Sequence, residues 1–125
     1  MAKAKRPRVR WKGEPEEHDF PAAADYLSLS FPEPVAAAIV EALRTATTTH
    51  RKAQDVLRAA QLELLPKGDP EVANDLKKVA RGEALSPVLL VRGAPLVVAD
   101  GYHRICASYH LAEDADIPCR IVDTP

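Results

Sequence analysis

The sequence has few aromatic residues, little cysteine and no long apolar run. Phe, Trp and Tyr make up 5% of the 125 residues, and the two cysteines are Cys106 and Cys119. A disulfide framework is therefore excluded, and the core must be built mainly from Leu, Val, Ile and Ala. No apolar stretch approaches the roughly 20 residues that a membrane-spanning helix needs, and the basic N-terminus lacks the apolar segment of a secretory signal. We expect one cytoplasmic domain without membrane contact.

Charge is nearly balanced overall but unevenly distributed along the chain. Six of the 17 basic residues and none of the 18 acidic residues lie in the first twelve positions, which leaves 11 basic and 18 acidic groups, a formal charge of −7, on the remainder. An acidic body does not favour a protein that grips duplex DNA over its surface. Residues 1–17 predict a disordered basic tail. It is either a solvated leader or a contact for nucleic acid or an acidic protein, with Trp11 adding stacking.

The apolar periodicity predicts an α+β fold in which helices cover one face of a small mixed sheet. Residues 18–60 are expected to form a helical N-terminal layer, and residues 61–125 an α+β core. Turn and capping signals place the elements as follows: a short helix from Pro21 to Leu27, helices at 33–46 and 50–60, a strand at 62–65, a helix capped by Asp69 and ended by Gly82, strands at 87–91 and 95–99, a helix at 102–111 and a strand at 118–122.

The stretch from Asp100 to Arg104 has the clearest chemistry in the sequence. An apolar strand ends at Asp100-Gly101, and a helix begins at once with Tyr102-His103-Arg104. Backbone N–H groups and the positive end of the helix dipole are then exposed beside an imidazole and a guanidinium. This pattern predicts an anion site, most often one for phosphate. The alternative is a solvent-exposed helix start whose charges only lie on the surface.

The same helix offers a metal site as an alternative. His103, Cys106 and His110 lie at positions i, i+3 and i+7 of one helix face, and Cys119 could supply a fourth ligand. A compact ligand pair such as Cys-x-x-Cys does not support this reading, and cysteine is one of the residue types most often simply buried. We therefore favour core packing over zinc.

Two histidine pairs precede this region. His18 and Asp19 are interpreted as a cap at the entry to the first helix, because nothing places a nucleophile near them. His50 and Arg51 would reach the anion site only if the N-terminal helical layer folded over it.

The segment from Leu85 to Leu111 resembles the ParB/sulfiredoxin superfamily. The entry Leu85-Ser86-Pro87, two apolar strands around a turn and a glycine followed by a basic helix start occur in the family's order. Gly101-Tyr102-His103-Arg104 is similar to the Gly-Cys-His-Arg of sulfiredoxins, and the spacing from Arg104 to Ala107 is similar to that of the ParB branch. The resemblance covers roughly residues 62–122.

This resemblance implies a nucleotide-phosphate site at the helix start. Gly101 would allow close backbone approach, His103 would donate to phosphate oxygens, and Arg104 would make a bidentate contact. Asp100 would either cap the helix or help to hold Mg²⁺. Tyr102 stands where sulfiredoxins have their nucleophilic cysteine, so sulfinic acid reduction is not expected. The sequence shows no second arginine-rich motif and no helix-turn-helix region, so chromosome partition is not expected either.

Three functions stay open from the sequence. The first, which we favour, is a ParB-like module that binds a nucleotide with Mg²⁺ through Asp100, Gly101, Tyr102, His103 and Arg104; whether the ligand is hydrolysed stays open. The second is a metal-dependent nuclease, against which the acidic body argues, because phosphate neutralisation supplies most non-specific binding. The third is a non-catalytic protein-interaction module that retains the fold.

Overall fold

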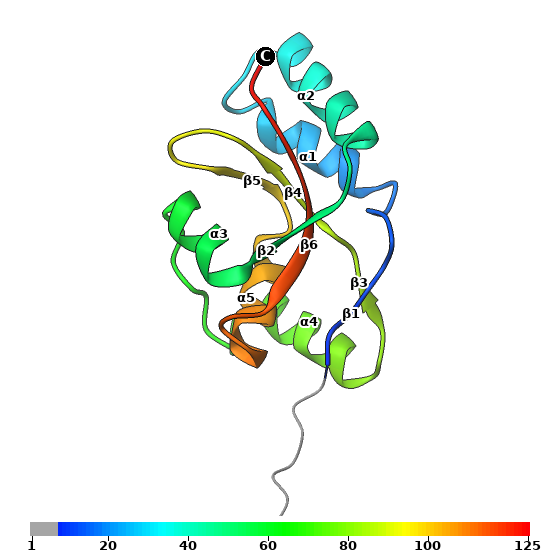
Figure 1. The fold of residues 1–125 in the computed structure, drawn as a ribbon, viewed down its shortest axis with the longest axis vertical. Coiled ribbons are helices and arrows are strands. Elements are labelled where there is room, and N and C mark those ends of the chain that lie inside the picture. The colour runs from blue at the N-terminus through cyan, green and yellow to red at the C-terminus, as the bar shows by residue number, and fades with distance from the viewer. Residues whose placement is uncertain (1–7) are drawn as a thin grey trace, which may run out of the picture.

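The structure is a computed structural model, and it describes residues 8–125 of the chain. It has a mixed α+β fold in which helices cover both faces of a four-stranded sheet (Figure 1). In chain order the elements are β1 (Arg10–Trp11), α1 (Asp19–Leu27), α2 (Glu33–Thr45), β2 (Thr49–Lys52), α3 (Ala53–Ala60), α4 (Pro70–Ala80), β3 (Ala84–Leu85), β4 (Val88–Val91), β5 (Val97–Asp100), α5 (Tyr102–Leu111) and β6 (Asp116–Val122). Within the described residues, none of these helices combines the length and apolar character needed to cross a bilayer.

The four-stranded sheet has the order β2-β6-β4-β5. β6 is antiparallel to β2 and parallel to β4, and β4 is antiparallel to β5 with a register shift between Leu89 and Leu90. Strand β4 is buried along its whole length, with Val88 and Leu90 in one core cluster and Leu89 and Val91 in the other. Because successive side chains of a strand point to opposite faces, this burial requires a helical layer on each face.

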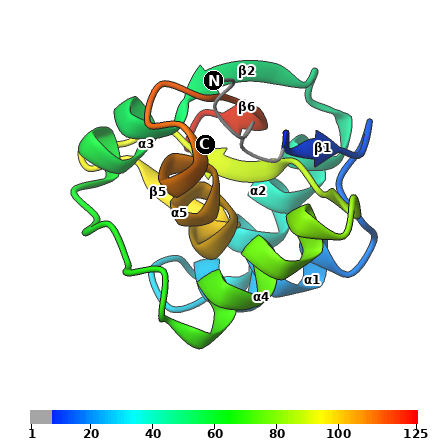
Figure 2. The same cartoon turned by 90° about the horizontal axis from the view of Figure 1, so that it is seen from below.

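The two helical layers differ from the predicted single layer over residues 18–60. Helices α1 and α2 pack with β4 and β5 on one face, whereas α3, α4 and α5 belong to the core on the other face. Figure 2 shows α4 and α5 side by side in this second layer. The expectation that helices cover one face was wrong, because α3 turns its apolar side chains to the face opposite α1 and α2.

Two local predictions in the middle of the chain were also wrong. Residues 49–52, expected to belong to a cap and a helix at 50–60, form edge strand β2, and the helix begins only at Ala53. Residues 62–65 do not form a strand. Their carbonyl groups instead meet side chains of α5, since the Tyr102 hydroxyl donates to Glu63 O and His110 Nε2 lies 2.7 Å from Leu65 O. These two carbonyl groups thus contact side chains, where in a strand they would accept from a neighbouring strand.

The part of the predicted tail that the structure describes is ordered in the fold. Arg10–Trp11 forms β1, which pairs in parallel with β3, and Lys12 N donates to Leu85 O at 2.8 Å. Trp11 is partly buried and packs against the core that contains α3 and α5. Disorder through Glu17 is therefore a wrong prediction for residues 8–17. Residues 1–7, which carry three of the six basic residues of the tail, lie outside the described part of the chain.

The segment that leads into the candidate site follows the prediction closely. Asp69 caps α4 by accepting from the backbone N–H groups of Glu71 and Val72 at 3.2 and 3.1 Å, and Pro70 occupies the first turn. Strands β4, β5 and β6 lie within two residues of their expected bounds, and α5 spans the predicted residues 102–111. The turn between β5 and α5 therefore lies at its predicted position.

Candidate functional site

Gly101 makes the turn between β5 and α5 possible. Its φ is +110°, and a Cβ built on it would lie 2.4 Å from Val88 Cγ1, on the neighbouring strand. A side chain at this position would therefore be strained and would also collide with the core. Gly101 is the N-cap residue of α5, and no side chain of the described residues caps this helix. The N–H groups of its first turn are left available to a ligand.

Arg104 lies in the first turn of α5 and is largely buried, with 16% of its side chain exposed. Its Nη2 donates to Asp100 Oδ2 at 2.9 Å and makes a longer contact of 3.5 Å with Pro87 O. Nη1 lies 3.9 Å from Asp19 Oδ1, which is beyond hydrogen-bond distance, and the buried Nε has no partner among the described residues. A guanidinium has five N–H donors, so Arg104 keeps unused donors inside the fold.

Asp100 does not cap the helix, which corrects one of its two predicted roles. Its carboxylate instead pairs with Arg104, and the buried Asp19 lies beside both. Burial raises the pKa of the Asp100 carboxyl, Arg104 opposes that shift, and Asp19 adds to it. Asp19 accepts from Glu16 N at 2.9 Å, so it stabilises the entry to α1. The cation of Arg104 thus connects α1 with the β5–α5 turn.

His103 connects the starts of α4 and α5. Its Nδ1 lies 2.7 Å from Glu71 Oε2, and its Nε2 lies 3.9 Å from the capping carboxylate of Asp69. About a third of the side chain is exposed. The imidazole is therefore held between acidic groups at the edge of the adjacent cavity. When protonated, it carries a donor on each ring nitrogen and would donate to an anion there.

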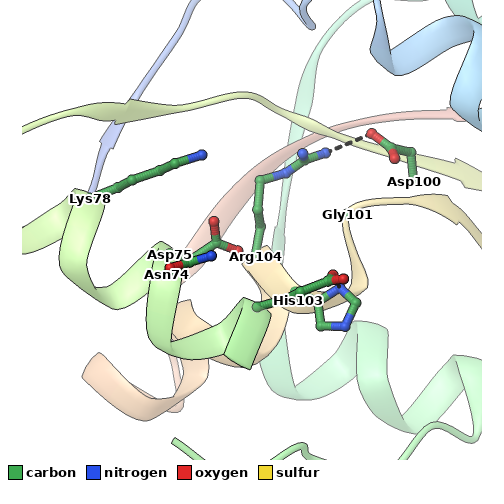
Figure 3. Close-up of a pocket in the computed structure, with 8 residues that line it drawn as sticks. Asn74, Asp75, Lys78, Asp100, Gly101, His103 and Arg104 are labelled. Carbon is green, nitrogen blue, oxygen red and sulfur yellow. Dashed lines mark hydrogen bonds and ion pairs between the residues drawn. The ribbon is translucent and has the colours of Figure 1, made fainter. Parts of the chain in front are cut away.

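A cavity of about 290 Å³ lies between α4 and α5 at this turn, and Figure 3 shows the side chains that surround it. Four of the five predicted ligand residues contribute to its wall, namely Asp100, Gly101, His103 and Arg104. The fifth, Tyr102, does not line it. The Tyr102 hydroxyl donates to Glu63 O, and burial raises the pKa of this tyrosine. The structure therefore gives no ligand contact to Tyr102.

Helix α4 supplies the other half of the cavity wall, which sequence reasoning missed. The lining residues of this helix are Glu71, Asn74, Asp75 and Lys78. They lie at positions i, i+3, i+4 and i+7, so they share one helix face. This polar stripe, which borders the apolar face with Val72 and Val79, was the signal available in the sequence. On its own, such a stripe is equally typical of the solvent side of an amphipathic helix.

The cavity combines groups of both charges. Lys78, His103 and Arg104 are the basic residues, and three carboxylates face them. Burial raises the pKa of the Asp75 carboxyl, although Lys78, Arg104 and His103 all act in the opposite direction. Buried carboxylates are stabilised by a cation, whereas the guanidinium and ammonium groups attract an anion. The arrangement therefore suits a ligand that brings an anion and a divalent cation together.

The ligands of the alternative zinc site on α5 do not come together in the described part of the chain. Cys106 is fully buried, and Cys119 lies 3.7 Å from Thr49 Oγ1 on the β2–β6 pair. His103 contacts Glu71, whereas His110 contacts Leu65 O. Burial raises the pKa of both thiols, which disfavours the thiolate form that binds zinc.

The second histidine pair of the sequence does not reach the cavity either. His50 and Arg51 lie on the edge strand β2, opposite Pro118 and Ile117 of β6, and neither residue lines the cavity. The N-terminal helical segment therefore does not bring His50 or Arg51 to the predicted anion site.

One group of side chains in residues 8–125 has donor atoms close enough together to hold a metal ion. It consists of Glu16, His18 and Asp19, before and at the start of α1. His18 Nε2 lies 3.0 Å from Glu16 Oε2 and 3.4 Å from Asp19 Oδ1, and Lys12 also pairs with Glu16. Lys12 thus already supplies one cation to this group, and His18 makes no side-chain cap, contrary to its predicted role.

Comparisons with known proteins identify no relative. A scan against protein-family models, a search of the curated proteins and a search of the solved structures each find no match to this chain. The resemblance to the ParB/sulfiredoxin superfamily therefore stays a prediction, and function has to be inferred from the geometry of the site.

Proposed function

We propose that the cavity between α4 and α5 binds the phosphate groups of a nucleotide together with Mg²⁺. The observation that carries this proposal is the position of Arg104, which is largely buried yet retains unused donors beside the uncapped start of α5. Guanidinium groups and helix N-termini both favour phosphate, and here they face the same cavity. Lys78 adds a third positive group from the opposite wall.

Magnesium is part of the proposal because of the acidic residues in the wall. A free phosphate would meet three carboxylates, and their repulsion would offset much of the attraction to Arg104 and Lys78. A divalent cation removes this conflict, since Mg²⁺ is bound by carboxylate and amide oxygens and by phosphates. Asp75, Asp100 and the side-chain oxygen of Asn74 are the groups that would hold it.

The size of the cavity limits what it can recognise. Its volume of about 290 Å³ is at the small end of ligand sites, which usually measure roughly 300–1,000 Å³. The phosphates would occupy it, and the base would lie largely outside. The lining residues include no serine, threonine or cysteine, but they include three carboxylates and His103. We assign binding of the nucleotide to this geometry and no chemical step.

The test is a titration of the full chain with nucleotides. CTP, ATP, GTP and their diphosphates are added with and without MgCl₂, and the melting temperature is followed before affinities are measured by calorimetry. A ligand at 100 times its Kd stabilises a protein by about 2.7 kcal/mol, which raises the melting temperature of a domain of this size by several degrees. We expect such a shift only when Mg²⁺ is present.

Lys78→Ala is the informative variant, because Lys78 is exposed and its loss should not disturb the core. Losing a charge-assisted contact to phosphate should weaken binding by at least about tenfold. Lys77→Ala is the matched control, since it removes the same charge from the neighbouring position of α4, which does not line the cavity. Equal losses in both variants, or no nucleotide that raises the melting temperature, would contradict the proposal and favour a protein-interaction module.

A further inference from the structure

The side chains of Glu16, His18 and Asp19 form a cluster of one imidazole and two carboxylates, and none of them lines the cavity between α4 and α5. Their three donor atoms all lie within 4.8 Å of one another, with His18 Nε2 3.0 Å from Glu16 Oε2 and 3.4 Å from Asp19 Oδ1. Atoms that bind one Zn²⁺ at about 2.1 Å lie roughly 3.0 Å apart when they subtend about 90° and roughly 3.4 Å apart at the tetrahedral angle. The imidazole is thus spaced from both carboxylates as zinc ligands are.

Each carboxylate of the cluster is held through one oxygen and presents the other to the imidazole. Asp19 Oδ2 accepts from Glu16 N at 2.9 Å, whereas Asp19 Oδ1 is the oxygen near His18. Lys12 pairs with Glu16 Oε1, whereas Glu16 Oε2 is the oxygen near His18. In metal sites, hydrogen bonds and ion pairs of this kind orient the ligands. The oxygens that an ion would need are therefore the ones left free.

Asp19 supplies an observation, beyond the proximity of the three groups, that points to a cation. Its side chain is only 3% exposed, and among residues 8–125 the one basic group outside the cluster within 4 Å of its carboxylate is Arg104, with Nη1 3.9 Å from Oδ1. That distance is beyond hydrogen-bond range, and Arg104 already donates to Asp100. A buried carboxylate oxygen that has lost its water and gained no close cation costs free energy.

The charges and the exposure of the cluster both suit a divalent ion. Lys12 is the partner of Glu16, and Arg104 is shared between Asp19 and Asp100, so three carboxyl groups meet two cations. The imidazole of the cluster is 76% exposed, and it contacts the buried oxygen directly. An ion that binds the imidazole from solvent therefore reaches the buried carboxylate without an opening of the core.

We propose that Glu16, His18 and Asp19 bind a zinc ion. A neutral imidazole is a good ligand for zinc, whereas Mg²⁺ and Ca²⁺ are bound mainly by oxygen atoms. Three protein ligands leave a fourth position of the ion for water. The ion would join the segment before α1 to its first residue, next to the carboxylate that faces Arg104. This site is separate from the proposed nucleotide site and does not require a nucleotide.

Calorimetric titration of the full chain, without an affinity tag, with ZnCl₂ tests this proposal. Zn²⁺ should bind saturably in the absence of nucleotide. His18→Ala removes one of three ligands and should weaken zinc binding by at least about tenfold, since even the loss of a group that only orients a ligand costs 10–100-fold. Because His18 is exposed, this variant should melt at the same temperature as the unmodified chain when metal is removed with EDTA.

His50→Ala is the matched control, because His50 is also exposed but lies on β2, outside the cluster. It should leave the zinc affinity unchanged. The proposal would be overturned if Zn²⁺ did not bind saturably to the unmodified chain, or if His18→Ala weakened binding no more than His50→Ala. Nucleotide binding with Mg²⁺ should be retained in His18→Ala, so a failure of the zinc site is distinguishable from a failure of the nucleotide site.

Discussion

The two ends of helix α5 form very different cavities. At its start, Arg104 lies among carboxylates and the helix has no side-chain cap, so charge dominates the site. Near its end, Ser108 is an isolated hydroxyl behind the mainly apolar wall of a second cavity, which Trp11 also lines. Both sites contain a buried polar atom without a partner in residues 8–125, namely Arg104 Nε and Ser108 Oγ. One is part of a cation and the other is neutral.

This difference separates two kinds of buried polar group on one helix. A buried cation without enough acceptors gains strongly from an anion, because both charges are then compensated in a medium of low polarity. A buried neutral hydroxyl gains only about one hydrogen bond from any partner. We therefore expect binding at the start of α5 to depend on salt and pH.

The largest effect is expected from Gly101→Ala, which tests the close approach of the β5–α5 turn to Val88 on β4. The new Cβ would collide with Val88 and would also require an unfavourable φ, so the free energy of unfolding should fall by about 3 kcal/mol. Urea denaturation measures this change. Gly82→Ala is the control, because Gly82 also has a positive φ of +77° but no atom lies within 4 Å of the position its Cβ would take.

Gly82→Ala should cost only about 1 kcal/mol, which is the effect of the backbone conformation alone. The difference between the two variants then isolates the contact between Gly101 and Val88. Similar losses in both would mean that the turn can move away from β4, and the close approach of Gly101 to Val88 would not limit the site.

A second pair of variants sharpens the comparison between the cation and the hydroxyl. Arg104→Met keeps most of the side-chain volume but leaves Asp19 and Asp100 without their cation, and we expect a loss of about 2 kcal/mol at pH 7. Ser108→Ala removes a polar atom that has no partner in the described residues, and the change should stay within about 0.5 kcal/mol. Thermal or urea denaturation measures both changes. Comparable losses would mean that the charge pairs of Arg104 do not make the start of α5 more sensitive than the region of Ser108.

The smallest effect concerns pH and the acidic wall of the first cavity. Burial raises the pKa values of Asp75 and Asp100 above the unfolded value, so the folded chain holds these protons to higher pH. Their contribution to stability is full below the unfolded pKa of about 3.9 and is lost as the pH rises through the folded pKa. The free energy of unfolding should therefore fall between about pH 4 and neutrality because of these groups.

Asp75→Asn should reduce this decline, and urea denaturation at several pH values measures it. Asp25→Asn is the control, because Asp25 is exposed on α1 and does not line the cavity between α4 and α5. Parallel stability curves for the unmodified chain and Asp75→Asn would mean that this carboxyl does not retain its proton on folding.

Much of the fold could be predicted because local signals decide it. Asp69 and Pro70 define the start of α4, and the apolar runs before and after Gly93 predict β4 and β5. Strands β1 and β2 could not be predicted in this way. β1 is only two residues long, and Thr49–Lys52 is polar and largely exposed at the sheet edge, so each depends on partners distant in sequence.

The candidate site was predictable to the extent that it is local. Gly101, His103 and Arg104 lie within four consecutive residues, and their geometry depends on a single turn. The α4 face with Asp75 and Lys78 could not be assigned, because its distance from that turn depends on how two helices pack. The contact of Asp19 with Arg104 could not be predicted for the same reason, since it crosses from one layer to the other.

The position of β6 in the sheet has a consequence for folding during synthesis. β6 is the last element in chain order, yet it lies between β2 and β4, and its Cys119 lies opposite Thr49, 70 residues earlier. During synthesis, β2 therefore leaves the ribosome long before its partner exists. A nascent chain that has not reached Val122 can form the β4–β5 hairpin but not the sheet that separates the two layers. Such intermediates expose unpaired strand edges, and long-range pairing of this kind is slow. The β5–α5 turn is thus translated before β6 and acquires its full support only when β6 has entered the sheet.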